Sequence, residues 1–148
     1  MRKYKAYMAA AALAFLMTII IAPEIHEGQE MEPLIAQGDV ILLLKQTYSE
    51  NRGMPEIGEV VVLKKYGLGE QHEEDNPIRR VTGLPGDRYL LDDGTEEVIK
   101  DNYVYISPEF QKEPESPLSG GNLIKSREIR GRAFLRLWPL DKLGGIDS

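Results

Sequence analysis

Few residues of this chain have the types and spacing that chemistry requires. Cysteine is absent, which excludes a disulfide and every cysteine-based metal or redox site. The two histidines, His26 and His72, stand beside glutamates in a way typical of solvated surface residues, and two are too few for an ordinary histidine metal site. We therefore expect neither a metal nor a cofactor. Several serines lie in polar or loop-like segments without a neighbouring base to activate them: Ser107, Ser116, Ser119 and Ser126.

Three stretches combine charged side chains with turn-forming glycine and proline. Residues 28–39 read GQEMEPLIAQGD and contain Glu30. Residues 78–87 read IRRVTGLPGD and contain Arg79, and their last five residues are expected to form a turn that ends a strand. The third stretch is IRGRA at residues 129–133, followed by Trp138 and Pro139. A carboxylate and a guanidinium can pair, but neither supplies the hydroxyl and the neutral base of serine-type hydrolysis.

Together the three stretches resemble type I signal peptidases. The nucleophile segment of that family reads Gly-x-Ser-Met-x-Pro-Thr-Leu-x-x-Gly-Asp, and a second segment reads Lys-Arg-Val-x-Gly-x-Pro-Gly-Asp. The family closes with Ile-x-Gly-Lys-Ala and Trp-Pro. Each match is short, but their order, their spacing and the apolar segment before them make the resemblance specific. It covers most of the chain after residue 22 and implies the family's β fold.

The resemblance implies a serine that attacks the carbonyl at an Ala-x-Ala site and a neutral lysine that takes its proton. By position the serine would be Glu30 and the lysine would be Arg79. A glutamate has no hydroxyl, and a neutral arginine at pH 7 would require a shift of at least about 5 pKa units, or roughly 7 kcal/mol. The family's lysine-supporting segment, Gly-Asp-Asn followed by Ser-x-Asp-Ser-Arg, is not recognisable in residues 107–119. We therefore expect no catalytic residues.

The two replaced positions carry opposite charges. We predict that Glu30 and Arg79 form an ion pair in place of the catalytic dyad, and the alternative is that both side chains point into solvent. Candidate residues of a former substrate groove are Gly28, Met31, Glu32 and Pro33.

The N-terminal segment indicates how the chain is organised. Residues 6–22 carry no charge, at the short end for a membrane span, and the basic residues at positions 2, 3 and 5 place the N-terminus in the cytoplasm. We expect a cytoplasmic segment (1–5), a transmembrane anchor (6–22) and an extracytoplasmic domain (23–148), hence a single-pass protein of the cell membrane. A cleaved signal peptide is the alternative, but cleavage after Ala22 would put Ile20 where a small residue is needed and Pro23 directly after the cut.

The domain beyond the anchor is acidic. Removing the three N-terminal basic residues from 18 leaves 15 against 24 acidic residues, a formal charge of −9 for residues 23–148. This charge argues against nucleic acid as a partner, because phosphate binding requires clustered lysine and arginine.

Short apolar runs predict a mainly β domain. Residues 40–44 are expected to be a strand buried on both faces, and a hairpin is expected around the Asp-Gly at residues 93 and 94. Residues 67–76 and 107–121 are expected to be loops. Further strands are expected near residues 59–63, 78–81, 89–91, 97–99, 103–106 and 132–138.

Three functional hypotheses follow. The first is a non-catalytic, membrane-tethered accessory protein, similar to signal-peptidase-like proteins of Gram-positive pilus loci that lack the serine–lysine pair and are needed for pilin polymerisation. Its partners would be pilin subunits and a sortase. The second is an active signal peptidase that cleaves at Ala-x-Ala sites with altered chemistry. The third is a secreted binding module that has inherited the fold.

Overall fold

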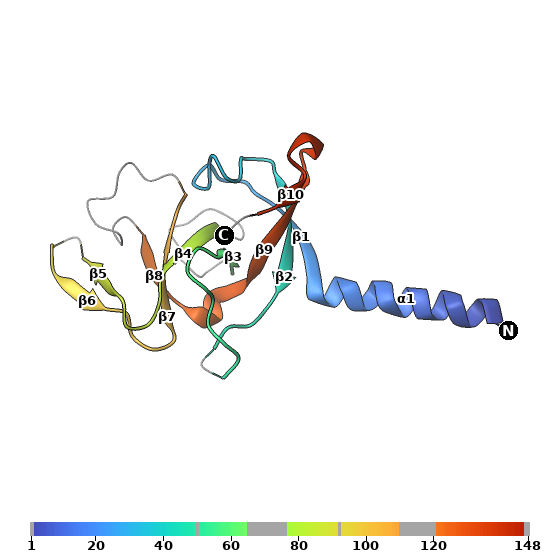
Figure 1. The fold of residues 1–148 in the computed structure, drawn as a ribbon, viewed down its shortest axis with the longest axis horizontal. Coiled ribbons are helices and arrows are strands. Elements are labelled where there is room, and N and C mark those ends of the chain that lie inside the picture. The colour runs from blue at the N-terminus through green and yellow to red at the C-terminus, as the bar shows by residue number, and fades with distance from the viewer. Residues whose placement is uncertain (1, 50, 65–76, 92, 110–120, 147–148) are drawn as a thin grey trace.

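A computed structural model describes residues 2–49, 51–64, 77–91, 93–109 and 121–146 (Figure 1). Within them, the chain forms one long helix, α1 (Arg2–Ile20), and a series of short strands, so the predicted mainly β fold is confirmed. Two 3-10 turns, Ser126–Glu128 and Leu140–Lys142, flank the longest strand. The strands are β1 (Ile21–Ile25), β2 (Val40–Lys45), β3 (Val60–Leu63), β4 (Ile78–Gly83), β5 (Arg88–Leu90), β6 (Glu96–Val98), β7 (Tyr103–Ser107), β8 (Asn122–Lys125), β9 (Ile129–Trp138) and β10 (Gly144–Gly145).

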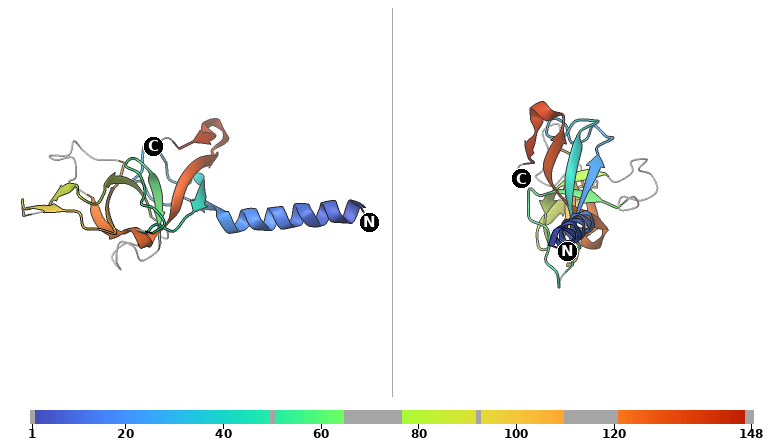
Figure 2. Two further views of the ribbon diagram at one scale, coloured as in Figure 1. Left: turned by 60° about the horizontal axis from the view of Figure 1, so that its bottom comes forward. Right: turned by 90° about the vertical axis from the view of Figure 1, so that its right-hand side faces the viewer.

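The main sheet is antiparallel, in the order β1-β2-β9-β3-β4-β7-β8, with β10 added to β9. Strand β9 is long enough to pair with both β2 and β3, so it joins the two halves of the sheet. Gly131 permits this close pairing, because a Cβ there would lie 2.2 Å from the backbone oxygen of Leu44. The predicted hairpin is confirmed as β5 and β6, which lie at the end of the domain remote from α1 (Figures 1 and 2).

Helix α1 projects from the domain as a separate rod in Figure 1 and in the left view of Figure 2. It ends at Ile20, whereas the predicted anchor extends to residue 22; Ile21 and Ala22 instead pair with Leu44 and Leu43 of β2. The physical reason is that β2 offers an open edge to these residues and Pro23 cannot continue a helix. Among the residues that the structure describes, no helix combines the length and apolarity needed to cross a membrane.

The core lies on both faces of strand β3, with Val60 and Val62 in one cluster and Val61 and Leu63 in another. In β2 the side chains alternate, with Ile41 and Leu43 fully buried and the residues between them half-buried, so the expectation of a strand buried on both faces is wrong for this segment. Strand β3 has that property instead, since all four of its residues are buried between β9 and β4. The predicted loop at residues 67–76 lies wholly outside the described residues, and the one at 107–121 lies mostly outside them. Its first residue, Ser107, belongs to β7.

Candidate functional site

The stretch at residues 28–39 forms a series of turns between β1 and β2. Its two inward-facing side chains, Met31 and Ile35, are fully buried and belong to the same core cluster as Ile41. The amide of Ile35 donates a hydrogen bond to the oxygen of Met31 (2.8 Å). These two anchors fix the polar residues between β1 and β2 against the sheet.

Asp39 closes this stretch. Its Oδ2 accepts a hydrogen bond from the amide of Ala36 (3.0 Å) and lies 3.4 Å from Nε of Arg136 on β9. Arg136 also donates to the oxygen of Leu34. The Gly-Asp at the end of the motif is therefore structural, because it ties the turns to the neighbouring strand.

Arg79 lies on β4 opposite Val61 of β3, and only 4% of its surface is exposed. Its Nη1 donates a hydrogen bond to the oxygen of Ile78 (2.7 Å). A guanidinium stays protonated at any physiological pH, so this buried position holds a permanent positive charge.

The structure brings Glu30 and Arg79 together, as predicted, but loosely. Oε1 of Glu30 lies 4.0 Å from Nη2 of Arg79, with 43% of the glutamate side chain exposed. The backbone oxygen of Glu30 accepts a hydrogen bond from the amide of Glu109, which follows β7 (2.8 Å). This contact between the two side chains is a charge interaction at the outer limit of an ion pair.

His26 is a member of this site that the sequence did not indicate. It is buried, with 2% of its surface exposed, so the prediction of a solvated surface histidine is wrong. Its amide donates to Asp39 and its oxygen accepts from Gly38, which places the ring beneath the turns (2.9 and 2.8 Å). Burial lowers the pKa of His26 below its usual value; Glu30 opposes this effect and Arg79 adds to it. Alternation along β1 was the only available signal, and it was missed because the predicted anchor included Ile21 and Ala22, the first two residues of that strand.

The four predicted groove residues differ in accessibility. Gly28 and Glu32 are half-buried and Pro33 is exposed, but Met31 is fully buried and therefore packs in the core instead of facing a ligand. The physical reason is the turn after Glu30, which directs the long apolar side chain towards β2.

The structure describes two of the four serines considered in the sequence, Ser107 and Ser126. Ser107 is buried and its Oγ lies 3.2 Å from Oγ1 of Thr82, while Ser126 lies beside β8. Ser116 and Ser119 fall outside the described residues, as does His72. Across the described ranges, no group of three histidine, aspartate or glutamate residues could hold a metal ion.

A family model described as "Signal peptidase, peptidase S26" matches residues 2–121. The chain belongs to this signal peptidase family. It is similar to "Probable signal peptidase I-2" of Synechocystis sp. (strain ATCC 27184 / PCC 6803 / Kazusa), with 26% identity over 163 residues, 95% of this chain and 74% of that protein. "Signal peptidase I" of Leptolyngbya laminosa is 24% identical over 158 residues, 88% of this chain and 75% of that protein. "Mitochondrial inner membrane protease subunit 1" of Homo sapiens is 28% identical over 131 residues, 79% and 69% of the two chains.

Proposed function

We propose that this chain is a non-catalytic member of the signal peptidase family. The observation that carries this proposal is the pair of side chains at the two dyad positions, the half-exposed Glu30 carboxylate 4.0 Å from the buried Arg79 guanidinium. Glu30 has no hydroxyl to attack a carbonyl, and Arg79 has no neutral form at pH 7 that could take a proton. His26 is neutral near pH 7, but its burial separates it from a substrate.

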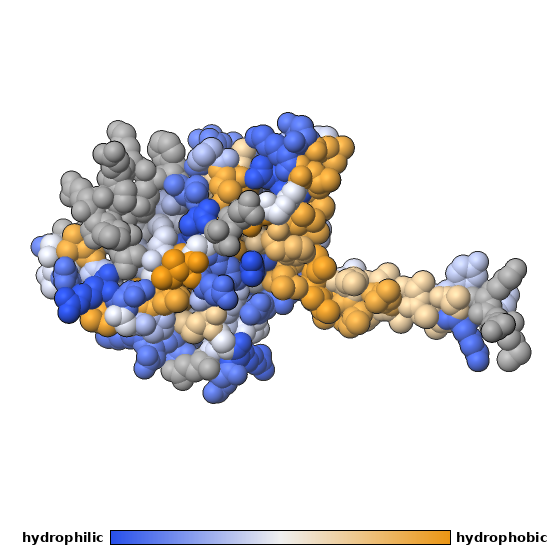
Figure 3. All heavy atoms as spheres, in the orientation of Figure 1, coloured by the Kyte–Doolittle hydropathy of each residue, from blue (hydrophilic) through white to orange (hydrophobic). Residues whose placement is uncertain are grey.

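We further propose that residues 6–20 of α1 tether the domain to the cell membrane, with the N-terminus in the cytoplasm and the domain outside. The described side chains of α1 are exposed, including large apolar ones such as Phe15 and Ile19. In Figure 3 the apolar surface of this helix continues onto the adjoining end of the domain. Exposed apolar side chains of this kind are stabilised by a lipid environment.

The accessory role that fits this arrangement is in pilus assembly, with pilin subunits and a sortase as partners. The resemblance to degenerate signal-peptidase-like proteins of pilus loci suggests these partners. The sheet ends in two edge strands, β1 and β8, and such edges can bind an extended segment by strand addition. Strand β1 lies directly after α1, so a segment bound there would lie close to the proposed membrane surface.

Deletion of the gene tests this role. If the proposal is right, pilin subunits stay monomeric in the deletion strain, and the full chain restores polymerisation. A Glu30→Ala chain restores it equally well, because no catalytic step uses that carboxylate. Normal polymerisation in the deletion strain would contradict the pilus role.

An active signal peptidase is the second candidate, because two of the similar proteins are called signal peptidases. It would require Glu30 to activate a water molecule, since a carboxylate cannot reproduce serine attack. Cleavage of an Ala-x-Ala substrate by the purified full chain, lost in Glu30→Ala, would favour this candidate over the first.

A further inference from the structure

Strand β8 is one of the two edges of the main sheet, and among the residues that the structure describes no strand pairs with its other side. The amide of Ser126 donates to the oxygen of Asn102 (2.8 Å), which continues the β7–β8 ladder by one residue. Because every second residue of an antiparallel strand bonds to the same neighbour, the amides and oxygens of Leu123 and Lys125 face away from β7. Within the described ranges, no backbone hydrogen bond outside this ladder involves either residue. Leu123 and Lys125 therefore form an open edge with backbone donors and acceptors.

The opposite edge of the sheet, β1, is less open. The amide of His26 donates to the oxygen of Asp39 on the β2 side (2.9 Å). By the same alternation, Ile21, Pro23 and Ile25 face outward. Pro23 has no N–H to donate, and a proline at an outward position protects an edge strand from pairing. Strand β8 contains no proline, so it is the better of the two edges for an added strand.

The open part of β8 is short. Before it, the amide of Gly121 already donates to the hydroxyl of Tyr105 (3.1 Å). After Lys125, the chain enters the 3-10 turn Ser126–Glu128. An added strand can therefore pair only with Leu123 and Lys125, and the few hydrogen bonds that these residues offer predict a reversible complex.

The side chains beside this edge differ along its length. Ile124 is buried in the core on one face of β8, and Leu123 and Lys125 lie on the other face. Leu123 packs with Tyr105, its neighbour on β7, in a small apolar cluster. Lys125 lies opposite Tyr103, with its Nζ 5.9 Å from the centre of that ring. One face of the edge thus presents an apolar side chain and then, two residues later, a cation.

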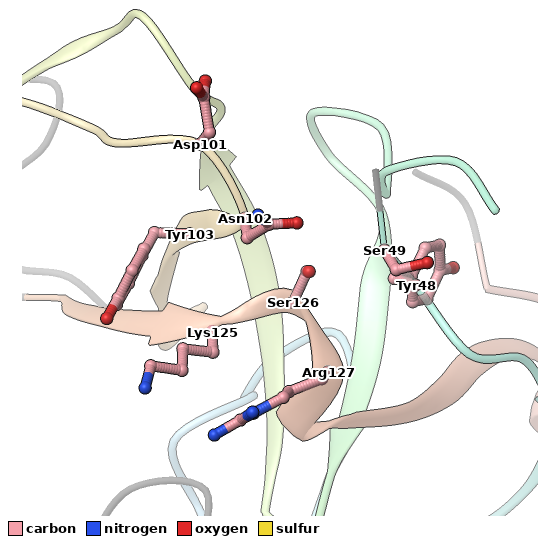
Figure 4. Close-up of a pocket in the computed structure, with 8 residues that line it drawn as sticks. All are labelled: Tyr48, Ser49, Asp101, Asn102, Tyr103, Lys125, Ser126 and Arg127. Atoms are coloured by element: carbon pink, nitrogen blue, oxygen red, sulfur yellow. The ribbon is translucent and has the colours of Figure 1, made fainter. Parts of the chain in front are cut away.

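Lys125 and Arg127 make this corner of an acidic domain basic. In Figure 4 their side chains extend to the same side as Tyr103, away from Ser126. Within the described part of the chain, Lys125 forms no ion pair. Arg127 contacts Glu128 through Nε at 3.4 Å, with 69% of the arginine side chain exposed, a pair of little energetic weight. The two cations favour an acidic partner and repel a second basic edge, such as that of another copy of this chain.

We propose that the open edge of β8 binds an extended acidic segment of a partner protein by antiparallel strand addition. Such a segment runs opposite to β8, so it places an acidic side chain opposite Lys125 and, two residues later, an apolar side chain opposite Leu123. The backbone groups supply the hydrogen bonds, and the side chains select the partner. This inference deepens the proposed accessory function, on which it rests, by naming the surface that holds the partner.

The test is a titration of the full chain in detergent micelles, followed by NMR at the amides of Leu123, Lys125 and Ile25. The probe is the capped peptide acetyl-Thr-Glu-Thr-Val-Thr-amide. We expect saturable shifts and slower hydrogen exchange at Leu123 and Lys125, and neither at Ile25 on β1. A second peptide with lysine in place of glutamate should bind about tenfold more weakly. A third peptide, methylated on the amide nitrogens of glutamate and valine that would face β8, should give no saturable shift.

Charge variants of the protein sharpen this test. Lys125→Glu/Arg127→Glu should lower the affinity for the acidic peptide about tenfold and raise the affinity for the lysine peptide. The matched control is Lys142→Glu, the same change at an exposed lysine beside β9, which should bind both peptides like the unchanged protein.

The inference is overturned if the acidic peptide gives no saturable shifts at Leu123 and Lys125 or shifts Ile25 instead. Equal affinity for the lysine peptide or the methylated peptide also overturns it. Shifts at Leu123 that grow with protein concentration in the absence of peptide would identify a second copy as the occupant and refute an acidic partner. The pilus role fails separately, because it depends on the deletion strain: unpolymerised pilin there supports that role even if no peptide binds β8.

Discussion

The contact between Glu30 and Arg79 should contribute little to stability, and a double-mutant cycle can measure how little. At 4 Å, two unit charges attract by about 1 kcal/mol in water and about 4 kcal/mol at an effective dielectric constant of 20. Because 43% of the Glu30 side chain is exposed, solvent screens most of this attraction. We expect a coupling free energy of about 0.5–1 kcal/mol.

The cycle uses Glu30→Gln, Arg79→Met and the double variant, with urea unfolding as the assay. Arg79→Met alone should cost about 1–3 kcal/mol, because the oxygen of Ile78 loses its donor in a buried position. Glu30→Gln alone should cost less than about 1 kcal/mol, because its carboxylate is partly hydrated.

Two further pairs calibrate the result. Glu24 and Arg130 are 2.5 Å apart, and the Glu24 side chain is only 11% exposed, so their coupling should exceed that of Glu30 and Arg79. Arg88 and Glu96 are exposed and should show almost no coupling. A Glu30–Arg79 coupling above about 2 kcal/mol, or one larger than that of the Glu24 pair, would refute the interpretation of a loose, screened contact.

Three other predictions concern His26, Tyr48 and Gly131. Because burial lowers the pKa of His26, the unfolded chain takes up a proton on this histidine at a higher pH than the folded chain does. The free energy of unfolding should therefore be unaffected by His26 above about pH 6.5 and fall as the pH drops below it. Urea unfolding should show a smaller fall in His26→Gln, and an identical fall would contradict the lowered pKa. Tyr48→Phe should cost about 1–3 kcal/mol, because the buried carboxylate of Glu59 loses its donor, and an unchanged urea midpoint would refute this. Gly131→Ala should lower the free energy of unfolding by more than about 2 kcal/mol, because its Cβ would overlap the backbone of β2. Gly144→Ala has open space around the new Cβ and should be nearly neutral. Equal thermal midpoints for the two variants would show that the close approach of β9 to β2 does not require glycine.

The sequence predicted those strands that have a clear local pattern of apolar or β-branched side chains. β-branched runs and the Asp-Gly turn correctly indicated β2, β3 and the β5–β6 hairpin. Strand β1 was missed because its apolar residues continue directly from the helix, and its strand conformation results from pairing with a distant edge of β2. Strand β8 follows a long polar segment and is likewise stabilised by pairing, here with β7.

Sequence reasoning also brought Glu30 and Arg79 together but did not predict their surroundings. The opposite charges of Glu30 and Arg79 are visible in the sequence, whereas their distance depends on how the turns at residues 28–39 dock on β4. His26 and Met31 are buried for the same reason, because these turns pack against the sheet. No local sequence pattern predicts that packing. The pair of Arg80 and Glu109, with Nε and Oε2 2.6 Å apart, joins β4 to the segment after β7 and was missed for the same reason.

The measurement that most directly tests the central claim is mass-spectrometric detection of cleavage. Purified full chain in detergent micelles is incubated with a signal-peptide substrate that contains an Ala-x-Ala site, with a catalytically active signal peptidase as the positive control. We predict that the positive control cleaves the substrate and that this chain leaves it intact at every pH from 6 to 9. Cleavage at the Ala-x-Ala site by this chain, abolished by Glu30→Ala, would contradict the proposal of a non-catalytic protein.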